Sequence, residues 1–243
     1  MGIDTPFLYR IAEIGTKEGI FPGGDVLILG DCRFHTPWAT GDNAADRDRF
    51  RDEYKLGRVE TVDVFGSPSI VMDLHQQAPP ELRNRFDMII DAGTMFCCFD
   101  VATVAKNCFE MLKDDGVIVH QAALSGYYGR CYYNFHPSLF KDLYEQNGFA
   151  LTNMEIRVFR EPNWLARLQY RYRRWRKLPV GEYTGIGAGT FLDYADFAEM
   201  QFGEKPGVVA AMIPIDALII CAARRRERRE FVRPLPSYYR DHH

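Results

Sequence analysis

Residues 85–121 read RFDMIIDAGTMFCCFDVATVAKNCFEMLKDDGVIVHQ, and apolar side chains follow two different spacings within them. Residues 85–93 are almost wholly apolar at their centre, which is typical of a strand buried on both faces. Residues 101–113 have the spacing of a helix, and residues 114–116 turn the chain into a second apolar strand at 117–121. A strand, a helix and a strand in this order predict a parallel sheet covered by helices.

The same alternation continues on both sides of this unit. Further apolar strands are predicted at 25–30, 59–66, 69–74, 150–159 and 215–224. Helices are predicted at 6–21, 44–56 and 137–149, the last beginning with a proline and ending at a glycine. The sequence therefore predicts an α/β fold with a doubly wound, Rossmann-like, seven-stranded sheet.

One segment interrupts the pattern. We interpret residues 160–213 as an insertion between the last two strands, within a single domain that spans residues 1–243. Its stretch RLQYRYRRWRKL (167–178) mixes basic and aromatic residues, so it is either a solvated helix or a surface for an anionic acceptor, an anionic membrane or nucleic acid. The motif GIGAG (185–189) follows no strand and is interpreted as a turn.

Bulk composition narrows the function classes. The net charge of −3 argues against a nucleic-acid-binding polycation. No apolar run approaches the roughly 20 residues of a membrane-spanning helix, and the N-terminus lacks a signal-peptide pattern. The six cysteines form no C-x-x-C pair, which predicts reduced thiols, a cytoplasmic location and no metal site.

Polar groups follow the predicted strands at the edge where ligands bind in doubly wound sheets. Four successive strand ends carry an acid, and these acids are Asp31, Asp63, Asp73 and Asp91. Carboxylates do not suit a phosphate, but they suit a ligand with hydroxyls, an exocyclic amine and an ammonium group. S-adenosylmethionine has all three.

Individual roles follow from this ligand. Asp63 would accept both ribose hydroxyls, and Asp73 would accept from the adenine amine while Met72 or Leu74 packs on the ring. Either Asp31 or Asp91 would pair with the ammonium group. The candidate cofactor-binding residues are Gly30, Asp31, Asp63, Val64, Met72, Asp73, Leu74, Asp91, Ala92 and Gly93.

The segments VLILG (26–30), VETVDV (59–64), SIVMDL (69–74), RFDMIIDAGT (85–94) and CFEMLKDDGVIVHQ (108–121) resemble, in this order, the core of class I S-adenosylmethionine-dependent methyltransferases. Residues 132–149, YYNFHPSLFKDLYEQNGF, are similar to a segment of one methyltransferase-like subgroup, in which an aromatic loop precedes a Pro-started helix. The resemblance implies S-adenosylmethionine as cofactor, methyl transfer as the activity and an antiparallel last strand at 215–224.

The sequence departs from that family at two places. After Gly30 the family has further glycines, whereas this chain has Asp31, Cys32, Arg33 and Phe34. Because S-adenosylmethionine has no pyrophosphate, this longer loop could still wrap the methionine end, unless Phe34 fills the space. The Glu-His pair of many relatives is replaced by Phe96 and Cys97, which removes an obvious acid–base pair.

The acceptor side is predicted from the end of strand 117–121 and the loop behind it. His120 and Tyr133 are the candidate catalytic residues, with His120 either a general base or a core histidine that only forms hydrogen bonds. Other residues that could face the acceptor are Gln121, Tyr127, Tyr128, Arg130, Asn134 and His136.

The function predicted is therefore methyl transfer from S-adenosylmethionine to a small-molecule acceptor, such as a sugar or a specialised metabolite. A non-catalytic methyltransferase-like binding domain and an RNA methyltransferase are the alternatives.

Overall fold

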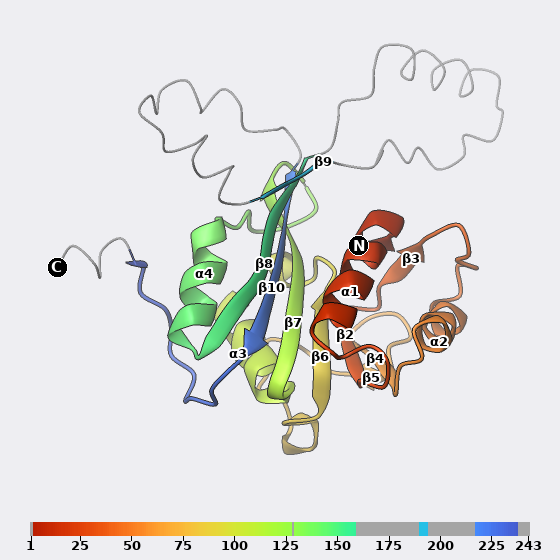
Figure 1. Ribbon diagram of the computed structural model, residues 1–243, viewed down its shortest axis with the longest axis horizontal. Helices are drawn as coiled ribbons and strands as arrows, with labels where there is room; N and C mark the ends of the chain where they lie inside the picture. Colours follow the sequence, from red (N-terminus) through yellow and green to blue (C-terminus); the bar gives the residue numbers. More distant parts are fainter. Residues whose placement is uncertain (1, 128, 159–189, 194–216, 238–243) are drawn as a thin grey trace, which may run out of the picture.

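A computed structural model of the chain describes residues 2–127, 129–158, 190–193 and 217–237. At its centre is an eight-stranded sheet in the order β5-β4-β2-β6-β7-β10-β8-β9, and a small second sheet pairs β1 with β3 (Figure 1). The strands are β1 Gly2–Asp4, β2 Val26–Leu29, β3 Arg33–His35, β4 Val59–Asp63, β5 Ile70–Val71, β6 Phe86–Asp91, β7 Leu112–Ser125, β8 Phe149–Val158, β9 Thr190–Asp193 and β10 Ala217–Arg225. The helices are α1 Thr5–Lys17, α2 Asn43–Glu53, α3 Val101–Met111 and α4 Pro137–Gln146, with short 3-10 turns η1 Pro80–Leu82 and η2 Met95–Cys97.

The predicted seven-stranded arrangement is confirmed. Strands β5, β4, β2, β6 and β7 pair in parallel, and β10 lies antiparallel between β7 and β8. An eighth strand, β9, pairs antiparallel with the outer edge of β8 and comes from within the predicted insertion. The other residues of 160–213, with the basic stretch and GIGAG, lie outside the described residues.

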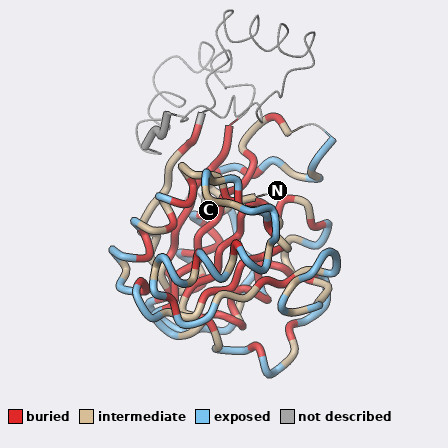
Figure 2. The backbone as a smooth tube through the Cα atoms, turned by 90° about the vertical axis from the view of Figure 1, so that its right-hand side faces the viewer, coloured by how far each residue is buried: buried red, intermediate tan, exposed pale blue. Residues whose placement is uncertain are grey.

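Helices cover both faces of the sheet, which explains why the central strands β2 and β6 are largely apolar and buried. All four residues of β2 are buried. Leu27 and Leu29 pack into the core under α3 and α4, whereas Val26 and Ile28 pack into the core under α1 and α2. Figure 2 shows this buried interior between the more exposed outer layers.

Strand β7 differs most from its predicted length. It begins at Leu112 rather than Val117, and the predicted turn at residues 114–116 lies inside it as an irregularity. Asp115 has a φ of 59°, and the pairing with β6 shifts register beside it, from Phe86↔Leu112 to Met88↔Val117. The turn residues were therefore recognised correctly, but β-pairing continues beyond them.

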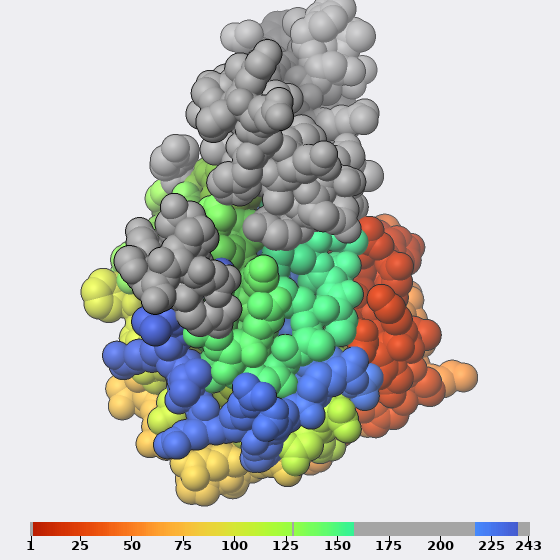
Figure 3. Space-filling model, turned by 60° about the vertical axis from the view of Figure 1, so that its left-hand side comes forward, coloured from red at the N-terminus to blue at the C-terminus, as the bar shows by residue number. Residues whose placement is uncertain are grey.

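The C-terminal segment packs along the sheet and α4 (Figure 3). Arg225 donates to the carbonyl oxygens of Phe109 and Leu112, so it caps the end of α3, whose last turn has no basic residue of its own. Asn147 then binds the tail backbone twice, donating to Val232 O at 2.9 Å and accepting from Val232 N at 2.8 Å. Among the helices of the described residues, none has both the length and the apolar composition that crossing a membrane requires.

Candidate functional site

Three strand ends meet around Gly30, directly after β2. Gly30 has a φ of 85°, and a Cβ there would lie 2.5 Å from Thr94 Oγ1 and 3.6 Å from Asp63 Oδ2. Thr94 follows β6 and Asp63 ends β4. The glycine is therefore required both by its backbone conformation and by the close approach of the neighbouring side chain. This carboxyl edge of the sheet is where ligands bind in doubly wound folds.

Asp63 is partly exposed at this edge, and its carboxylate already binds the backbone. Its Oδ1 accepts from the N–H groups of Val64 and Phe65 at 2.7 and 3.1 Å, and its Oδ2 accepts from Asp31 N at 2.8 Å. A carboxylate offers about four acceptor sites, so about one remains. Asp63 can thus accept one further donor in this geometry, not the two ribose hydroxyls predicted.

Asp31 points toward the loop that follows β4. Its Oδ2 accepts from Ser67 N at 2.9 Å, and its Oδ1 lies 3.6 Å from the Arg47 guanidinium. The Asp31 side chain is only 10% exposed. It braces the two loops, and Oδ1 is buried without a hydrogen bond among the described residues.

The segment after Gly30 is a strand rather than a cofactor loop. Residues Arg33–His35 pair in parallel with Gly2–Asp4 at the start of the chain. Phe34 is buried in the core under α1 and α2, with its ring centroid 5.4 Å from that of Trp38 and 5.6 Å from that of Phe50. It therefore does not occupy the space at the carboxyl edge.

The residues after β5 lie beside Asp63. Met72 N donates to Asp63 O at 3.0 Å. Asp73 Oδ1 accepts from His75 N at 2.9 Å and contacts His75 Nδ1 at 2.8 Å, and these bonds lower the pKa of Asp73. His75 Nε2 in turn accepts from Phe99 N at 3.0 Å, which joins this loop to the one after β6. Asp73 is ionised at neutral pH and partly exposed.

Leu74 is buried, and a buried asparagine of α3 organises the chain around it. Asn107 Nδ2 donates to the carbonyl oxygens of Leu74 and Gln76 at 2.9 and 2.7 Å, and its Oδ1 accepts from Ala78 N at 2.8 Å. Leu74 thus belongs to the core beneath the edge.

Asp91 holds the turn after β6. It is fully buried, and its Oδ1 accepts from the N–H groups of Gly93, Thr94 and Met95 at 3.1, 2.7 and 3.1 Å. Thr94 Oγ1 donates to Leu29 O at 2.7 Å, which fixes the turn against β2. Ala92 and Gly93 lie within this turn and are also buried. We refer to residues 92–95 as the cofactor-side turn.

His120 lies behind Asp91 rather than at the surface. It is 1% exposed, its Nδ1 lies 2.8 Å from Asp91 Oδ2, and its Nε2 is bonded to the Tyr144 hydroxyl of α4. Burial raises the pKa of Tyr144 well above its usual value. Gln121 is buried as well, and its Oε1 accepts from Arg157 at 3.3 Å. Neither strand-end residue reaches the surface where an acceptor would bind.

Tyr133 does lie at the edge, in the loop between β7 and α4. Its backbone N–H donates to Phe96 O at 3.2 Å, and its hydroxyl donates to Phe99 O at 3.0 Å. The Tyr127 ring packs near Phe96 with centroids 6.1 Å apart. Of the other residues predicted here, Arg130 and Asn134 are exposed, His136 caps α4, and Tyr128 lies outside the described residues.

Large apolar side chains are exposed around this edge. Each lies at the carboxyl end of a parallel strand or in the loop that follows it: Val64, Phe65, Val71, Phe99 and Tyr132. Phe99 and Tyr132 form an edge-to-face pair with centroids 6.0 Å apart. Exposed aromatic groups beside carboxylates suit a ligand that has both a flat ring and hydrogen-bond donors.

No disulfide joins any of the six cysteines. Burial raises the pKa of Cys97 to about 11 and that of Cys98 to about 12. In the part of the chain that the structure describes, no three His, Cys, Asp or Glu side chains come together as metal ligands would.

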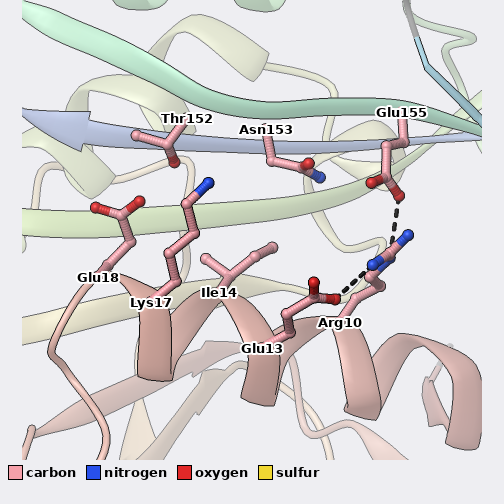
Figure 4. Close-up of a pocket in the computed structure, with 8 residues that line it drawn as sticks. All are labelled: Arg10, Glu13, Ile14, Lys17, Glu18, Thr152, Asn153 and Glu155. Carbon is pink, nitrogen blue, oxygen red and sulfur yellow. Dashed lines mark hydrogen bonds and ion pairs between the residues drawn. The ribbon is translucent and has the colours of Figure 1, made fainter.

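A small groove lies between α1 and β8 (Figure 4). A bulge in β8 turns the consecutive side chains of Thr152 and Asn153 toward α1. Arg10 spans the groove and pairs with Glu155 at 3.1 Å. With a volume of about 50 Å³, the groove has room for a few water molecules.

Comparison with solved structures defines the fold. The chain superposes over 90% of its length on a Galdieria sulphuraria protein assigned as a sarcosine dimethylglycine methyltransferase, with a TM-score of 0.52, 12% identity and 84% of that chain covered. It also superposes on the [4+2]-cyclase SpnF with a TM-score of 0.51, 13% identity and coverages of 89% and 80%. The chain has the class I methyltransferase fold. No family model and no curated protein matches the sequence.

A neighbour solved with ligands also matches. The Burkholderia thailandensis 1,6-didemethyltoxoflavin-N1-methyltransferase was solved with 1,6-didemethyltoxoflavin and S-adenosylhomocysteine, and it matches with a TM-score of 0.50 and 14% identity over 90% of this chain and 78% of that one. At such low identity, the likeness shows the fold and leaves the activity to be argued from the site.

Sequence reasoning missed several residues that shape this methyltransferase-fold site. Thr94, Asn107 and Tyr144 all form the hydrogen bonds described above, but the sequence patterns did not predict a role for them in the site. Asn107 had a detectable signal, because it is a polar residue among the apolar positions of a predicted helix. Tyr144 had none, because a tyrosine on the buried face of an amphipathic helix is usually packing.

Proposed function

We propose that the protein is an S-adenosylmethionine-dependent methyltransferase that acts on a small-molecule acceptor. The observation that carries the proposal is the convergence of Gly30, Asp63 and Thr94 at the carboxyl edge of a class I methyltransferase sheet. The carboxylates and exposed aromatic side chains around this point fit the hydroxyl, amine and ring groups of that cofactor.

Each part of the cofactor has a candidate partner. Asp63 has about one acceptor site left for a ribose hydroxyl. Asp73 keeps its Oδ2 outside the contacts with His75, so it can accept from the adenine amine while Phe65 or Val64 packs on the ring. Of the two carboxylates considered for the ammonium group, only Asp31 retains an oxygen that accepts no hydrogen bond.

The bound cofactor would supply an activated methyl group on sulfur. What the chain must provide is orientation and exclusion of water, because displacement at an activated centre depends mainly on positioning. Tyr133 and the exposed Phe99–Tyr132 pair are suited to hold an acceptor with apolar surface. A buried His120 is not needed as a general base when the acceptor is already a good nucleophile.

Ligand binding tests the cofactor assignment directly. A ligand at 100 times its Kd stabilises a protein by about 2.7 kcal/mol. For a chain of this size, each 1 kcal/mol raises Tm by roughly 2–4 °C, so S-adenosylhomocysteine should raise Tm by about 5–10 °C. The variant Asp63→Asn should reduce this shift, whereas Asp48→Asn, on the exposed face of α2, should not. No shift at millimolar ligand would refute the proposal.

Two outcomes separate the alternative functions. Formation of S-adenosylhomocysteine with a panel of hydroxyl and amine acceptors supports catalysis. Saturable cofactor binding without turnover on any acceptor favours a binding domain. The fold also occurs in SpnF, a [4+2]-cyclase, so binding alone does not define the reaction. An RNA methyltransferase would be retained on RNA at moderate salt.

A further inference from the structure

A buried chain of three polar side chains links α4 to the centre of the sheet. Tyr144 of α4 contacts His120 of β7, and His120 contacts Asp91 of β6. None of the three is more than 1% exposed. A buried polar group without a hydrogen-bond partner destabilises the fold. The protons of these three side chains must therefore be placed so that each donor faces an acceptor.

The partners of the chain define that arrangement. Asp91 accepts three backbone N–H bonds through Oδ1, which is how an ionised carboxylate is stabilised. Its Oδ2 therefore accepts from His120, and Nδ1 must carry the proton. Nε2 is then an acceptor, and Tyr144, whose raised pKa keeps its hydroxyl protonated, donates to it.

One end of the chain reaches the cofactor-side turn. Asp91 orders residues 93–95 by three hydrogen bonds, and Thr94 is held against Leu29 O, with its Oγ1 beside Gly30. Both oxygens of Asp91 already accept hydrogen bonds from the protein itself. Asp91 therefore affects ligand binding by holding this turn in place rather than by contacting the ligand. The orientation of its carboxylate depends on the His120 ring.

The other end reaches the loop that carries Tyr133. The Phe140 ring of α4 lies on His120, with centroids 5.0 Å apart. Phe135 contacts Phe140 edge-to-face at 5.7 Å, and Tyr133 stacks on Phe135 at 6.2 Å. The His120 imidazole is therefore linked to the loop that carries Tyr133 by ring packing through Phe140 and Phe135. It is linked to the cofactor-side turn by its hydrogen bond to Asp91.

We propose that Tyr144 is a positioning residue for cofactor binding: its hydroxyl fixes the orientation of the His120 ring, and through Asp91 it holds the cofactor-side turn. The inference rests on the proposed function for its ligand. Removing the hydroxyl leaves Nε2 buried without a donor, so the imidazole loses one of its two hydrogen-bond anchors. The ring can then change its orientation, and Asp91 loses a fixed partner.

Tyr144→Phe tests this assignment, because it removes one oxygen and keeps the ring. Isothermal titration should show a Kd for S-adenosylhomocysteine raised by roughly 2- to 30-fold, the range of mutations that act through a buried network. Backbone amides of residues 93–95 should exchange hydrogen faster than in the unmodified protein. Ile11→Val, a buried change in the core on the opposite face of the sheet, is the control for lost stability and should leave Kd unchanged within twofold.

Nitrogen NMR of the unmodified protein adds a test that needs no variant. Nδ1 of His120 should carry a proton and Nε2 should accept from Tyr144, and a proton on Nε2 would overturn the chain as described. An unchanged Kd in Tyr144→Phe, or an equal rise in Ile11→Val, would also overturn it. If the unmodified protein does not bind S-adenosylhomocysteine, the proposed function fails. The positioning role is then decided by amide exchange at residues 93–95, and unchanged exchange in Tyr144→Phe refutes it.

Discussion

Replacing Gly30 by alanine perturbs the point where three strand ends meet. The new Cβ would lie 2.5 Å from Thr94 Oγ1, closer than side-chain atoms approach without movement. Gly30 also has a φ of 85°, which residues with a Cβ rarely adopt. Thr94 cannot simply rotate away, because its hydroxyl donates to Leu29 O at 2.7 Å.

The two costs can be estimated separately. A left-handed backbone costs a residue with a Cβ about 1–2 kcal/mol. Loss of the Thr94 hydrogen bond costs roughly 0.5–1.5 kcal/mol more. We therefore expect Gly30→Ala to lower the free energy of unfolding by about 1.5–3.5 kcal/mol.

Urea unfolding of four variants separates these costs. Gly41 has a φ of 87° and nothing within 4 Å of its would-be Cβ, so Gly41→Ala measures the backbone cost alone. Gly30→Ala should cost roughly 0.5–1.5 kcal/mol more than Gly41→Ala. In a Thr94→Ala background, that excess should disappear. The reasoning is refuted if Gly30→Ala costs no more than Gly41→Ala, or if its cost is the same without the Thr94 hydroxyl.

Three further expectations concern other parts of the fold. A hydrogen bond from Arg58 is the main cause of the lowered pKa of Asp25 in the folded protein. Ionised Asp25 therefore stabilises the fold above its unfolded pKa of about 3.8, and this stabilisation is lost as the pH falls through the lower folded pKa. The Tm of Asp25→Asn should therefore fall less between pH 6 and pH 2 than the Tm of the unmodified protein. Parallel plots of Tm against pH for the two proteins would contradict this. Arg225→Met should lower the free energy of unfolding in urea by about 1.5–3 kcal/mol, since two carbonyl oxygens at the end of α3 lose a charged donor. Asn147→Ala removes both bonds to Val232, so limited proteolysis should cut the C-terminal segment faster, and an unchanged cleavage rate would show that packing alone holds it.

The sheet could be predicted because its central strands, β2 and β6, are largely apolar, which is a local signal. The sequence does contain a signal for the short β3, because apolar and polar residues alternate from Cys32 to His35 with the period of a strand. That signal covers only four residues after Gly30, where related folds have a cofactor loop. The N-terminal strand that pairs with it has only three residues, too few for periodicity to detect.

Only part of the site could be predicted from the sequence, because some of its contacts join residues that are far apart along the chain. Carboxyl ends of parallel strands share one edge, so the gathering of acids there follows from topology. Which of these acids face solvent depends on partners that are distant in sequence. The carboxylate of Asp91, for example, contacts His120 of the neighbouring strand β7. Asp63 and Asp91 look alike in sequence, but the first is partly exposed and the second is fully buried.

The position of β10 has a consequence for how the chain folds during synthesis. Residues 217–225 pair with β7 on one side and β8 on the other, so these two earlier strands have no shared neighbour until residues 217–225 are made. Until then, both present unpaired backbone edges that can bind other chains. Folding must therefore wait for contacts between residues about 100 positions apart in sequence, which slows it and prolongs the exposure of these edges. Truncation before residue 217 would leave the sheet divided in two.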